Sequence, residues 1–215
     1  MVAKRKKDLA PPWHAVHVIG SLQTGGAEKM VVNFLQAADK TRFRHTVLCL
    51  SHAGEMAPEV EACGVEVKVH RMRFRRFWRD IEALASWFRQ ENVAVVHSHM
   101  YYATVWARVA GLRAGVPVLV TTEHGKELWK NSFHNALGNW LSKRTHKHIC
   151  VSHDVLDLRT RRQGQLADRS LVIPNGVPIP SDEGVAGIRA RIRGEFGLGV
   201  DQPVFGTVGR VVEAK

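Results

Sequence analysis

Long apolar segments are absent from this 215-residue sequence, and no run approaches the roughly 20 residues that a membrane-spanning helix requires. The first residues, Met1–Asp8, are mostly basic, and the apolar stretch of a secretory signal does not follow them. Both absences argue against insertion into a membrane or export across one. We therefore expect a cytoplasmic protein, which could still lie peripherally on the inner face of a membrane.

Cysteine is also scarce. The three thiols are Cys49, Cys63 and Cys150, an odd number of widely spaced residues in apolar surroundings. A disulfide framework or a structural zinc site would use more cysteines at closer and more regular spacings. We therefore expect three thiols in the protein core. The sequence also contains no internal repeat and no low-complexity tract.

Acidic residues are the third shortage, since 20 Asp and Glu stand against 31 Lys and Arg, which gives a formal net charge of +11. This excess fits an anionic partner such as a nucleic acid, a nucleotide-sugar or an anionic membrane face. The basic residues are spread over many segments and form no known nucleic-acid recognition motif, so we expect no nucleic-acid partner. The 45% hydrophobic and 24% charged residues are typical of a soluble globular protein.

What the sequence does contain is a regular alternation of short strand-like and helix-like segments. This pattern predicts an α/β fold with a Rossmann-like, doubly wound parallel sheet. Strands are expected at 15–19, 45–50, 65–69, 93–97, 116–121, 148–151, 171–173 and 203–208, and helices at 27–38, 55–62, 80–90, 102–114, 133–144, 152–162 and 188–196. The expected parts are a basic tail (1–12), a Rossmann-like domain (13–180), a hinge or linker (181–202), and the first strand and loop of a further domain (203–215).

A diglycine pair, Gly25-Gly26, lies between the first expected strand and the first expected helix. Glycine has no Cβ, so the backbone can adopt positive φ there and a ligand can approach closely, while the free N–H groups of the helix start favour an anion. The pattern predicts a phosphate-binding turn. An ordinary turn from strand to helix is the structural alternative.

The most biased segment is residues 70–79. In it, aromatic and methionine side chains are interleaved with five arginines: Arg71, Arg73, Arg75, Arg76 and Arg79. Such a mixture could dock on an anionic bilayer with the aromatic rings dipping in, or bind phosphates with stacking as on a nucleic acid. It could equally be a solvated loop whose aromatic side chains pack into the core.

Short motifs follow several of the expected strands. They are Gly25-Gly26-Ala27-Glu28, His97-Ser98-His99, Thr122-Glu123-His124-Gly125, Val151-Ser152, Ile173-Pro174-Asn175-Gly176-Val177, and Gly209-Arg210 followed by Lys215. In order and spacing they resemble the group 1, or family 4, retaining glycosyltransferases over nearly the whole sequence. The resemblance implies the N-terminal domain of a GT-B glycosyltransferase, truncated before most of the second domain.

In a GT-B enzyme two Rossmann-like domains face each other across a cleft, the first binding mainly the acceptor and the second the nucleotide-sugar. The resemblance therefore implies the acceptor-binding half of an enzyme that transfers a sugar from a nucleoside-diphosphate-sugar to a lipid or polysaccharide acceptor in envelope glycan synthesis. The family's Glu-x7-Glu motif, which holds the donor's sugar and ribose, has no counterpart in this sequence. We therefore expect weak donor binding, and at most weak transfer, by these 215 residues alone.

By the same resemblance, Gly25 and Gly26 approach the donor's diphosphate, and His124 is the catalytic-site residue that hydrogen-bonds the transferred sugar. Arg210 and Lys215 grip the donor phosphates and stabilise the leaving group, so no metal and no other cofactor is expected. The remaining candidates are Asn175 and Gly176 near the donor, with His97 and His99 lining the cleft. Two other functions stay open, namely a non-catalytic carbohydrate- or partner-binding domain and, on charge alone, a basic nucleic-acid-binding domain.

Overall fold

The computed structural model describes residues 10–126, 129, 131–163, 167–179 and 181–207. The chain divides into two compact units, Met1–Val177 and Pro178–Lys215. The first unit contains the sheet and the candidate site residues that the structure describes. The second contains the helix α7 (Val185–Glu195).

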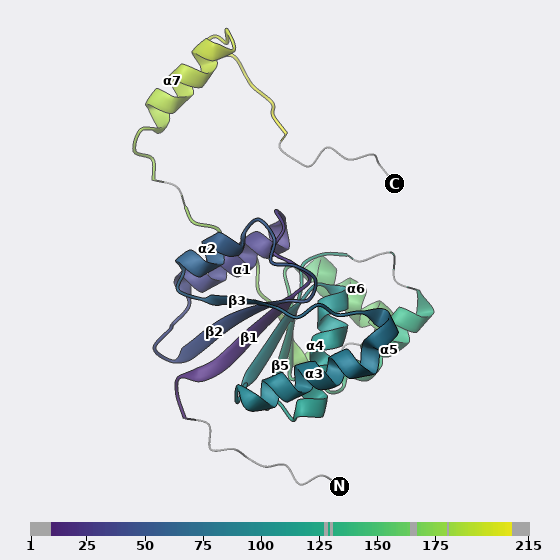
Figure 1. Cartoon of the computed structure of the whole chain (residues 1–215). Helices are drawn as coiled ribbons and strands as arrows, with labels where there is room; N and C mark the ends of the chain where they lie inside the picture. The colour runs from purple at the N-terminus through teal and green to yellow at the C-terminus, as the bar shows by residue number, and fades with distance from the viewer. Residues whose placement is uncertain (1–9, 127–128, 130, 164–166, 180, 208–215) are drawn as a thin grey trace. The chain divides into compact units, whose positions relative to one another are not determined.

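Within the described residues, seven parallel strands form one sheet in the order β3-β2-β1-β4-β5-β6-β7 (Figure 1). The strands are β1 (Trp13–Ile19), β2 (Phe43–Cys49), β3 (Glu66–Val69), β4 (Val95–His99), β5 (Val118–Glu123), β6 (Lys147–Cys150) and β7 (Ser170–Val172). The order runs outward from the adjacent β1 and β4 in both directions. This arrangement confirms the predicted doubly wound, Rossmann-like sheet.

Helices cover the two faces of the sheet in separate groups. They are α1 (Gly26–Ala37), α2 (Ala57–Ala62), α3 (Phe77–Gln90), α4 (Tyr101–Ala114), α5 (Ser132–Ser142) and α6 (His153–Gln163), with the short 3-10 turns η1 (Phe74–Arg76) and η2 (Ala167–Arg169). In Figure 1, α1 and α2 lie on one face, and α3, α4 and α5 lie on the other. Right-handed crossovers account for this division, because the strand order advances in opposite directions on the two sides of β1.

Each face has its own hydrophobic core. Side chains of α1 and α2 pack on β1 and β2 through residues such as Val31, Leu35 and Val60, all almost fully buried. On the other face α3 contributes Ile81 and Phe88, whose spacing of seven residues places them on one side of a helix. Apolar residues at helical spacing therefore hold the sheet from both sides and fix the positions of its strand ends.

The helix α3 begins three residues before its expected start at residue 80. The ring of Phe77 lies 4.4 Å from that of Trp106 on α4, so packing between the two helices extends α3 into the arginine-rich segment. Tertiary contact decides this helix end, because arginine and aromatic residues have no strong preference for a helix start.

The second unit differs from the expectation at its end. A strand was expected from residue 203, but residues 203–207 form no regular structure, and residues 208–215 lie outside the described residues. A strand needs a neighbouring strand to satisfy its backbone hydrogen bonds, and no described residue pairs with 203–207. The expected helix, in contrast, is present as α7.

The cysteines are free thiols. Cys49 and Cys150 are buried as expected, whereas Cys63 is only partly buried. Burial raises the pKa of the Cys49 thiol to about 11, which makes it an inert part of the core.

Candidate functional site

The carboxyl ends of β1 and β4 mark the point where the strand order changes direction. These strands are neighbours, with His17 of β1 opposite His97 of β4 in the register. Ligands of open α/β sheets bind beyond the carboxyl ends of the strands at such a point. The loop after β1, residues 20–25, and Met100 after β4 therefore form the natural place to look for a site.

The diglycine bend is open, but its backbone differs from the expectation. Gly25 is extended at φ −171° and precedes α1, and neither glycine has positive φ, so the bend does not use the positive φ that glycine permits. Gly25 is the residue before the first helical turn, a position that takes extended angles in any sequence. A Cβ on Gly26 would meet no atom within 4 Å, and Gly26 is exposed. The glycines thus leave the start of α1 accessible.

One acidic group lies at this bend. The carboxylate of Glu28, in the first turn of α1, reaches to 2.3 Å from the position that a Cβ on Gly25 would occupy. Gly25 is the N-cap residue of α1, and among the described residues no side-chain hydrogen bond caps this helix start. A negative charge near a helix start is stabilised by the helix dipole, and the carboxylate of Glu28 occupies such a position.

The loop after β1 is held by the loop after β2. The Leu22 N–H donates to the Ala53 carbonyl oxygen at 2.8 Å, and the Met56 N–H donates to the Leu22 carbonyl oxygen at 2.8 Å. Gly54 has φ +89°, and a Cβ there would lie 2.3 Å from the Leu22 carbonyl carbon. Only glycine permits this approach of one backbone to the other, which positions the diglycine bend.

The start of α4 carries a strained residue. Met100 immediately precedes the helix at φ 64° and ψ 153°, a region that residues other than glycine rarely adopt. Met100 is 41% exposed, and no side chain of the described residues caps α4. Two uncapped helix starts, those of α1 and α4, therefore follow the two strands at which the order reverses.

His124 follows β5 at the same edge of the sheet. Its Nε2 lies 3.1 Å from Nδ1 of His99, the last residue of β4. His97 is hydrogen-bonded through Nε2 to the Thr122 hydroxyl at 2.7 Å. The three candidate histidines of the sequence motifs are thus brought together, with His99 between the other two in a chain of ring contacts.

Two further histidines, which the sequence motifs did not indicate, belong to this group. His17 stacks on His99 and donates or accepts a hydrogen bond to His45 of β2 at 3.1 Å between Nε2 and Nδ1. The ring of Phe34 on α1 covers His17 at 5.2 Å. The sequence held one usable signal for His17, which lies between the apolar residues Val16 and Val18, but its contact with His45 depends on the strand register.

Three of these histidines, His17, His97 and His99, are kept neutral. Burial, reinforced by His124, lowers the pKa of His97 to about 4. Burial, together with the neighbouring histidines, lowers the pKa of both His17 and His99 well below the ordinary value. At neutral pH these imidazoles therefore offer lone pairs and N–H groups rather than charge.

Other sequence candidates are placed less closely. Asn175 and Gly176 are exposed, and the Gly176 carbonyl oxygen accepts a hydrogen bond of 3.4 Å from Asn33 on α1. This hydrogen bond places Gly176 beside α1, several residues along the helix from the diglycine bend. Arg210 and Lys215 lie outside the described residues.

A buried ion pair lies beneath the site. Glu123, the last residue of β5, pairs with Arg159 of α6, and their side chains are only 8% and 5% exposed. Burial lowers the pKa of the neighbouring Arg108 to about 10, although Glu123 opposes this shift. The ion pair therefore links α6 to Glu123, the residue directly before His124.

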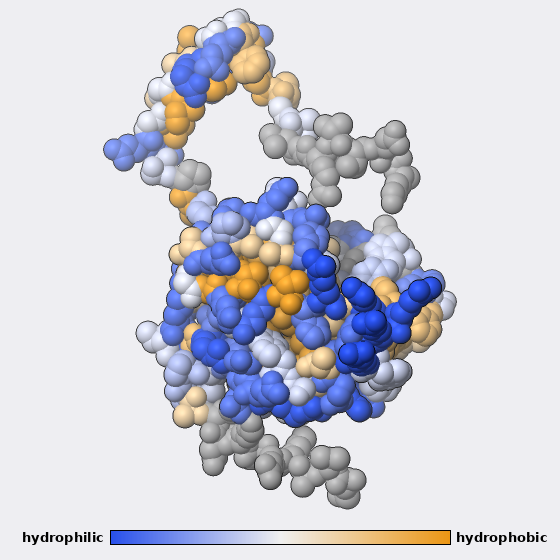
Figure 2. Space-filling view, in the orientation of Figure 1, coloured by the Kyte–Doolittle hydropathy of each residue, from blue (hydrophilic) through white to orange (hydrophobic). Residues whose placement is uncertain are grey.

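The arginine-rich segment is exposed. All five of its arginines reach solvent, as do Phe74 at 73% and Trp78 at 71%. Met72 and Phe77 instead pack against the core. In Figure 2 strongly hydrophilic side chains lie beside hydrophobic ones where α3 begins.

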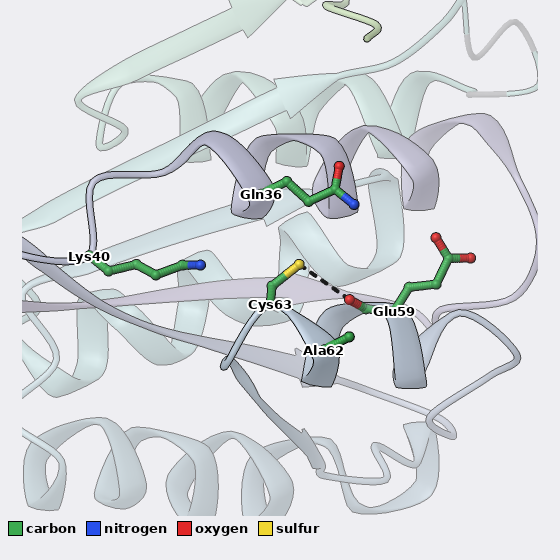
Figure 3. Close-up of a pocket in the computed structure, with 5 residues that line it drawn as sticks. All are labelled: Gln36, Lys40, Glu59, Ala62 and Cys63. Carbon is green, nitrogen blue, oxygen red and sulfur yellow. Dashed lines mark hydrogen bonds between the residues drawn. The ribbon is translucent and has the colours of Figure 1, made fainter. Parts of the chain in front are cut away.

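A pocket of ≈ 380 Å³ lies elsewhere, between α1 and α2 (Figure 3). Its lining residues are Gln36, Lys40, Glu59, Ala62 and Cys63. Gln36 lies in the last turn of α1 and Lys40 follows the end of this helix, opposite to the end that carries the diglycine bend. The pocket is therefore separate from the site at the carboxyl ends of the strands.

The family model described as Glycosyltransferase Family 4 matches residues 24–179. A search of curated protein sequences finds no match to this chain. Within the described residues, every helix is too short or too polar to span a lipid bilayer.

Several solved structures share the fold. Anabaena Alr3699/HepE in complex with UDP-glucose matches with a TM-score of 0.69 and 16% identity, over 86% of this chain and 50% of that one. A glycosyltransferase from Rickettsia africae matches at 0.68 and 12%, over 90% and 52%. Acinetobacter baumannii MurG matches at 0.56 and 11%, over 85% and 54%. The chain thus spans about half the length of these structures.

Proposed function

Because the chain belongs to Glycosyltransferase Family 4, we propose that it is the acceptor-binding half of a retaining glycosyltransferase that takes a nucleoside-diphosphate-sugar as donor. The proposed acceptor is a lipid or polysaccharide used in envelope glycan synthesis. Anabaena HepE, which shares the fold, forms complexes with UDP and with UDP-glucose. These relatives support the class of donor.

The observation that carries the proposal is the open diglycine bend at the point where the strand order reverses. Gly26 starts α1 with free space in front of it, and the start of α4 lies after the neighbouring strand. The N–H groups of a helix start bind phosphate and favour its negative charge. We assign the donor's diphosphate to this bend.

His124 would hydrogen-bond the sugar being transferred. Its contact with His99 orients the imidazole, and Thr122 holds His97 behind it. In retaining transfer the new bond forms on the face that the diphosphate leaves, so the leaving phosphate itself can accept the acceptor's proton. This half of the enzyme then needs no pair of catalytic carboxylates. Arg210 and Lys215 would stabilise the charge that grows on the diphosphate.

Donor binding is tested by titrating the 215-residue chain with UDP-glucose and measuring the bound ligand by ligand-observed NMR. A Cβ at Gly26 meets no atom within 4 Å, so the side chain of Gly26→Val should project into the space before α1 and abolish the saturable signal. Gly187→Val is the matched control, because a Cβ there also meets no atom within 4 Å, and it should bind as the parent does. Equal binding by the Gly26 variant would remove the assignment. Glycan binding without any nucleotide-sugar binding would favour the non-catalytic alternative.

The arginine-rich segment is the proposed contact with an anionic membrane surface, where a lipid acceptor would be found. Phe74 and Trp78 are exposed beside five exposed arginines, and the Phe74 ring lies 6.1 Å from that of the exposed Tyr102. Arginines bind anionic headgroups while aromatic rings enter the interface. The surface therefore combines both requirements of a peripheral membrane contact.

Co-sedimentation with vesicles containing phosphatidylglycerol tests this contact. Arg75→Glu with Arg76→Glu should release the chain from the vesicles. Arg161→Glu with Arg162→Glu makes the same change in net charge on exposed arginines of α6 and should leave binding nearly intact. If the two double variants lose binding equally, net charge and not this segment is responsible.

A further inference from the structure

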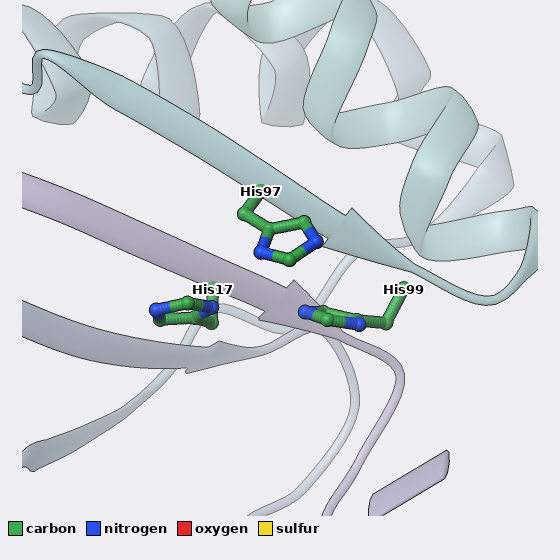
Figure 4. Close-up of side chains that lie close together, drawn as sticks. All are labelled: His17, His97 and His99. Atoms are coloured by element: carbon green, nitrogen blue, oxygen red, sulfur yellow. The ribbon is translucent and has the colours of Figure 1, made fainter. Parts of the chain in front are cut away.

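We propose that His17, His97 and His99 form a binding site for one divalent transition-metal ion of the kind that imidazole ligands prefer, such as Zn²⁺. One ring nitrogen from each residue lies within 4.8 Å of the other two. Figure 4 shows the three rings side by side, with His97 between His17 and His99. This metal site goes beyond the proposed transfer reaction. The prediction that the transfer reaction needs no metal is a different claim and does not depend on this site.

The strand register explains why these rings meet. His17 and His97 are opposite each other on the adjacent parallel strands β1 and β4. His99 follows two residues later on β4, and alternate residues of a strand share a face. The three ligands are thus carried by the rigid centre of the sheet and not by mobile loops.

Two of the ring nitrogens have no other use in the structure. Nδ1 of His17 and Nε2 of His99 are buried and have no hydrogen-bond partner among the described residues. These side chains are 2% and 5% exposed. A buried polar atom without a partner costs about 1–3 kcal/mol, so two of them in one cluster point to a missing ligand.

The opposite nitrogen of each ring is held by a hydrogen bond. His17 Nε2 pairs with His45, His97 Nε2 with Thr122, and His99 Nδ1 with His124. If each of these nitrogens carries the proton and donates it, Nδ1 of His17, Nδ1 of His97 and Nε2 of His99 keep their lone pairs. Metal-binding histidines are characteristically oriented in this way by an outer partner.

The chemistry of the set fits Zn²⁺ better than Mg²⁺ or Ca²⁺, because it offers neutral imidazole nitrogen and no oxygen ligand. Three histidines leave a fourth tetrahedral position for water or another ligand. Zinc–nitrogen bonds of about 2.0–2.1 Å bring ligand nitrogens to about 3.4 Å from one another, so the rings would close by on the order of 1 Å. Phe34 supplies an apolar wall over His17 and His97.

The test is Zn²⁺ titration of a chain without a histidine tag, in competition with a chromophoric chelator. The parent chain should bind one ion. His99→Gln should weaken binding by more than about 100-fold, and His45→Gln, which removes an outer partner, by about 10–100-fold. His14→Gln is the matched control, because His14 is a buried histidine of β1 that bonds Thr46 on the opposite face. Its affinity should equal that of the parent chain.

Circular dichroism establishes that each variant is folded, and a second measurement needs no variant. Co²⁺ bound to the parent chain should show visible bands of a low-coordinate, nitrogen-ligated ion without thiolate charge-transfer bands. The proposal fails if the parent binds no Zn²⁺, if His99→Gln binds as tightly as the parent, or if thiolate bands show that a cysteine holds the metal.

Discussion

Acidification from pH 7 to pH 5 should destabilise the folded chain through His148, a buried histidine of β6 outside the candidate site. Its Nε2 lies 3.5 Å from the Ser142 carbonyl oxygen. Burial, together with the nearby Arg108, Arg159 and Arg169, lowers the pKa of His148 to about 4, although the hydrogen bond with the Ser142 carbonyl opposes the shift. The folded chain therefore holds this imidazole neutral among cations.

The sign of the effect follows from proton linkage. An unfolded chain protonates this histidine near its ordinary pKa of 6.5, whereas the folded chain does so only near 4. The full stabilisation is present above pH 6.5 and is lost as the pH falls toward 4. Linkage gives a loss of about 2 kcal/mol between pH 7 and pH 5, and of about 3 kcal/mol over the whole window.

Urea unfolding at pH 7 and at pH 5, followed by circular dichroism, measures this loss. In His148→Gln the amide nitrogen can keep the hydrogen bond to Ser142 but cannot titrate, so the variant should lose about 2 kcal/mol less than the parent between the two pH values. The other buried histidines contribute to both proteins and cancel in the difference. His52→Gln removes an exposed imidazole and is the matched control. An unchanged pH dependence in His148→Gln would refute the reasoning.

Three further predictions concern stability, each measured by urea unfolding at pH 7. Glu123→Leu should cost about 3–5 kcal/mol because it removes a buried carboxylate that pairs with Arg159, and the double variant with Arg159→Leu should recover much of the loss; an additive double variant would contradict the pairing. Gly64→Ala should lower the free energy of unfolding by about 1–2 kcal/mol, because a residue with a Cβ disfavours positive φ. Gly54→Ala should lower it by more, because Gly54 has positive φ and its Cβ would also meet the Leu22 backbone. Met100→Gly should stabilise the chain by about 1 kcal/mol through relief of strain, and a loss would show that its side chain matters more.

Much of the fold was predictable from local sequence patterns. The alternation of strand-like and helix-like segments placed all seven strands and seven helices of the described residues within a few residues of their observed bounds. Element ends were less predictable, as α3 shows, because the contact of Phe77 with Trp106 lies across two helices. The strand expected from residue 203 failed for a related reason, since a strand exists only with a partner.

The candidate site was predictable in outline. Motifs that follow parallel strands must share one edge of the sheet, and this rule places Gly25, Gly26 and His124 at the same edge from the sequence alone. The close approach of Gly54 to the Leu22 carbonyl carbon was not predictable. It depends on how two loops pack against each other, which no local pattern records.

The sequence by itself determined the fold class, the family and the order of the candidate residues, because hydrophobic periodicity and motif spacing are properties of neighbouring positions along the chain. Only the tertiary structure decided that His17 and His45 join His97, His99 and His124. The register between β1, β2 and β4 sets those contacts, and it results from the packing of whole strands and helices. The contacts among these histidines, and the chemistry that depends on them, are therefore set by the pairing of strands and not by the residues that neighbour each histidine in the sequence.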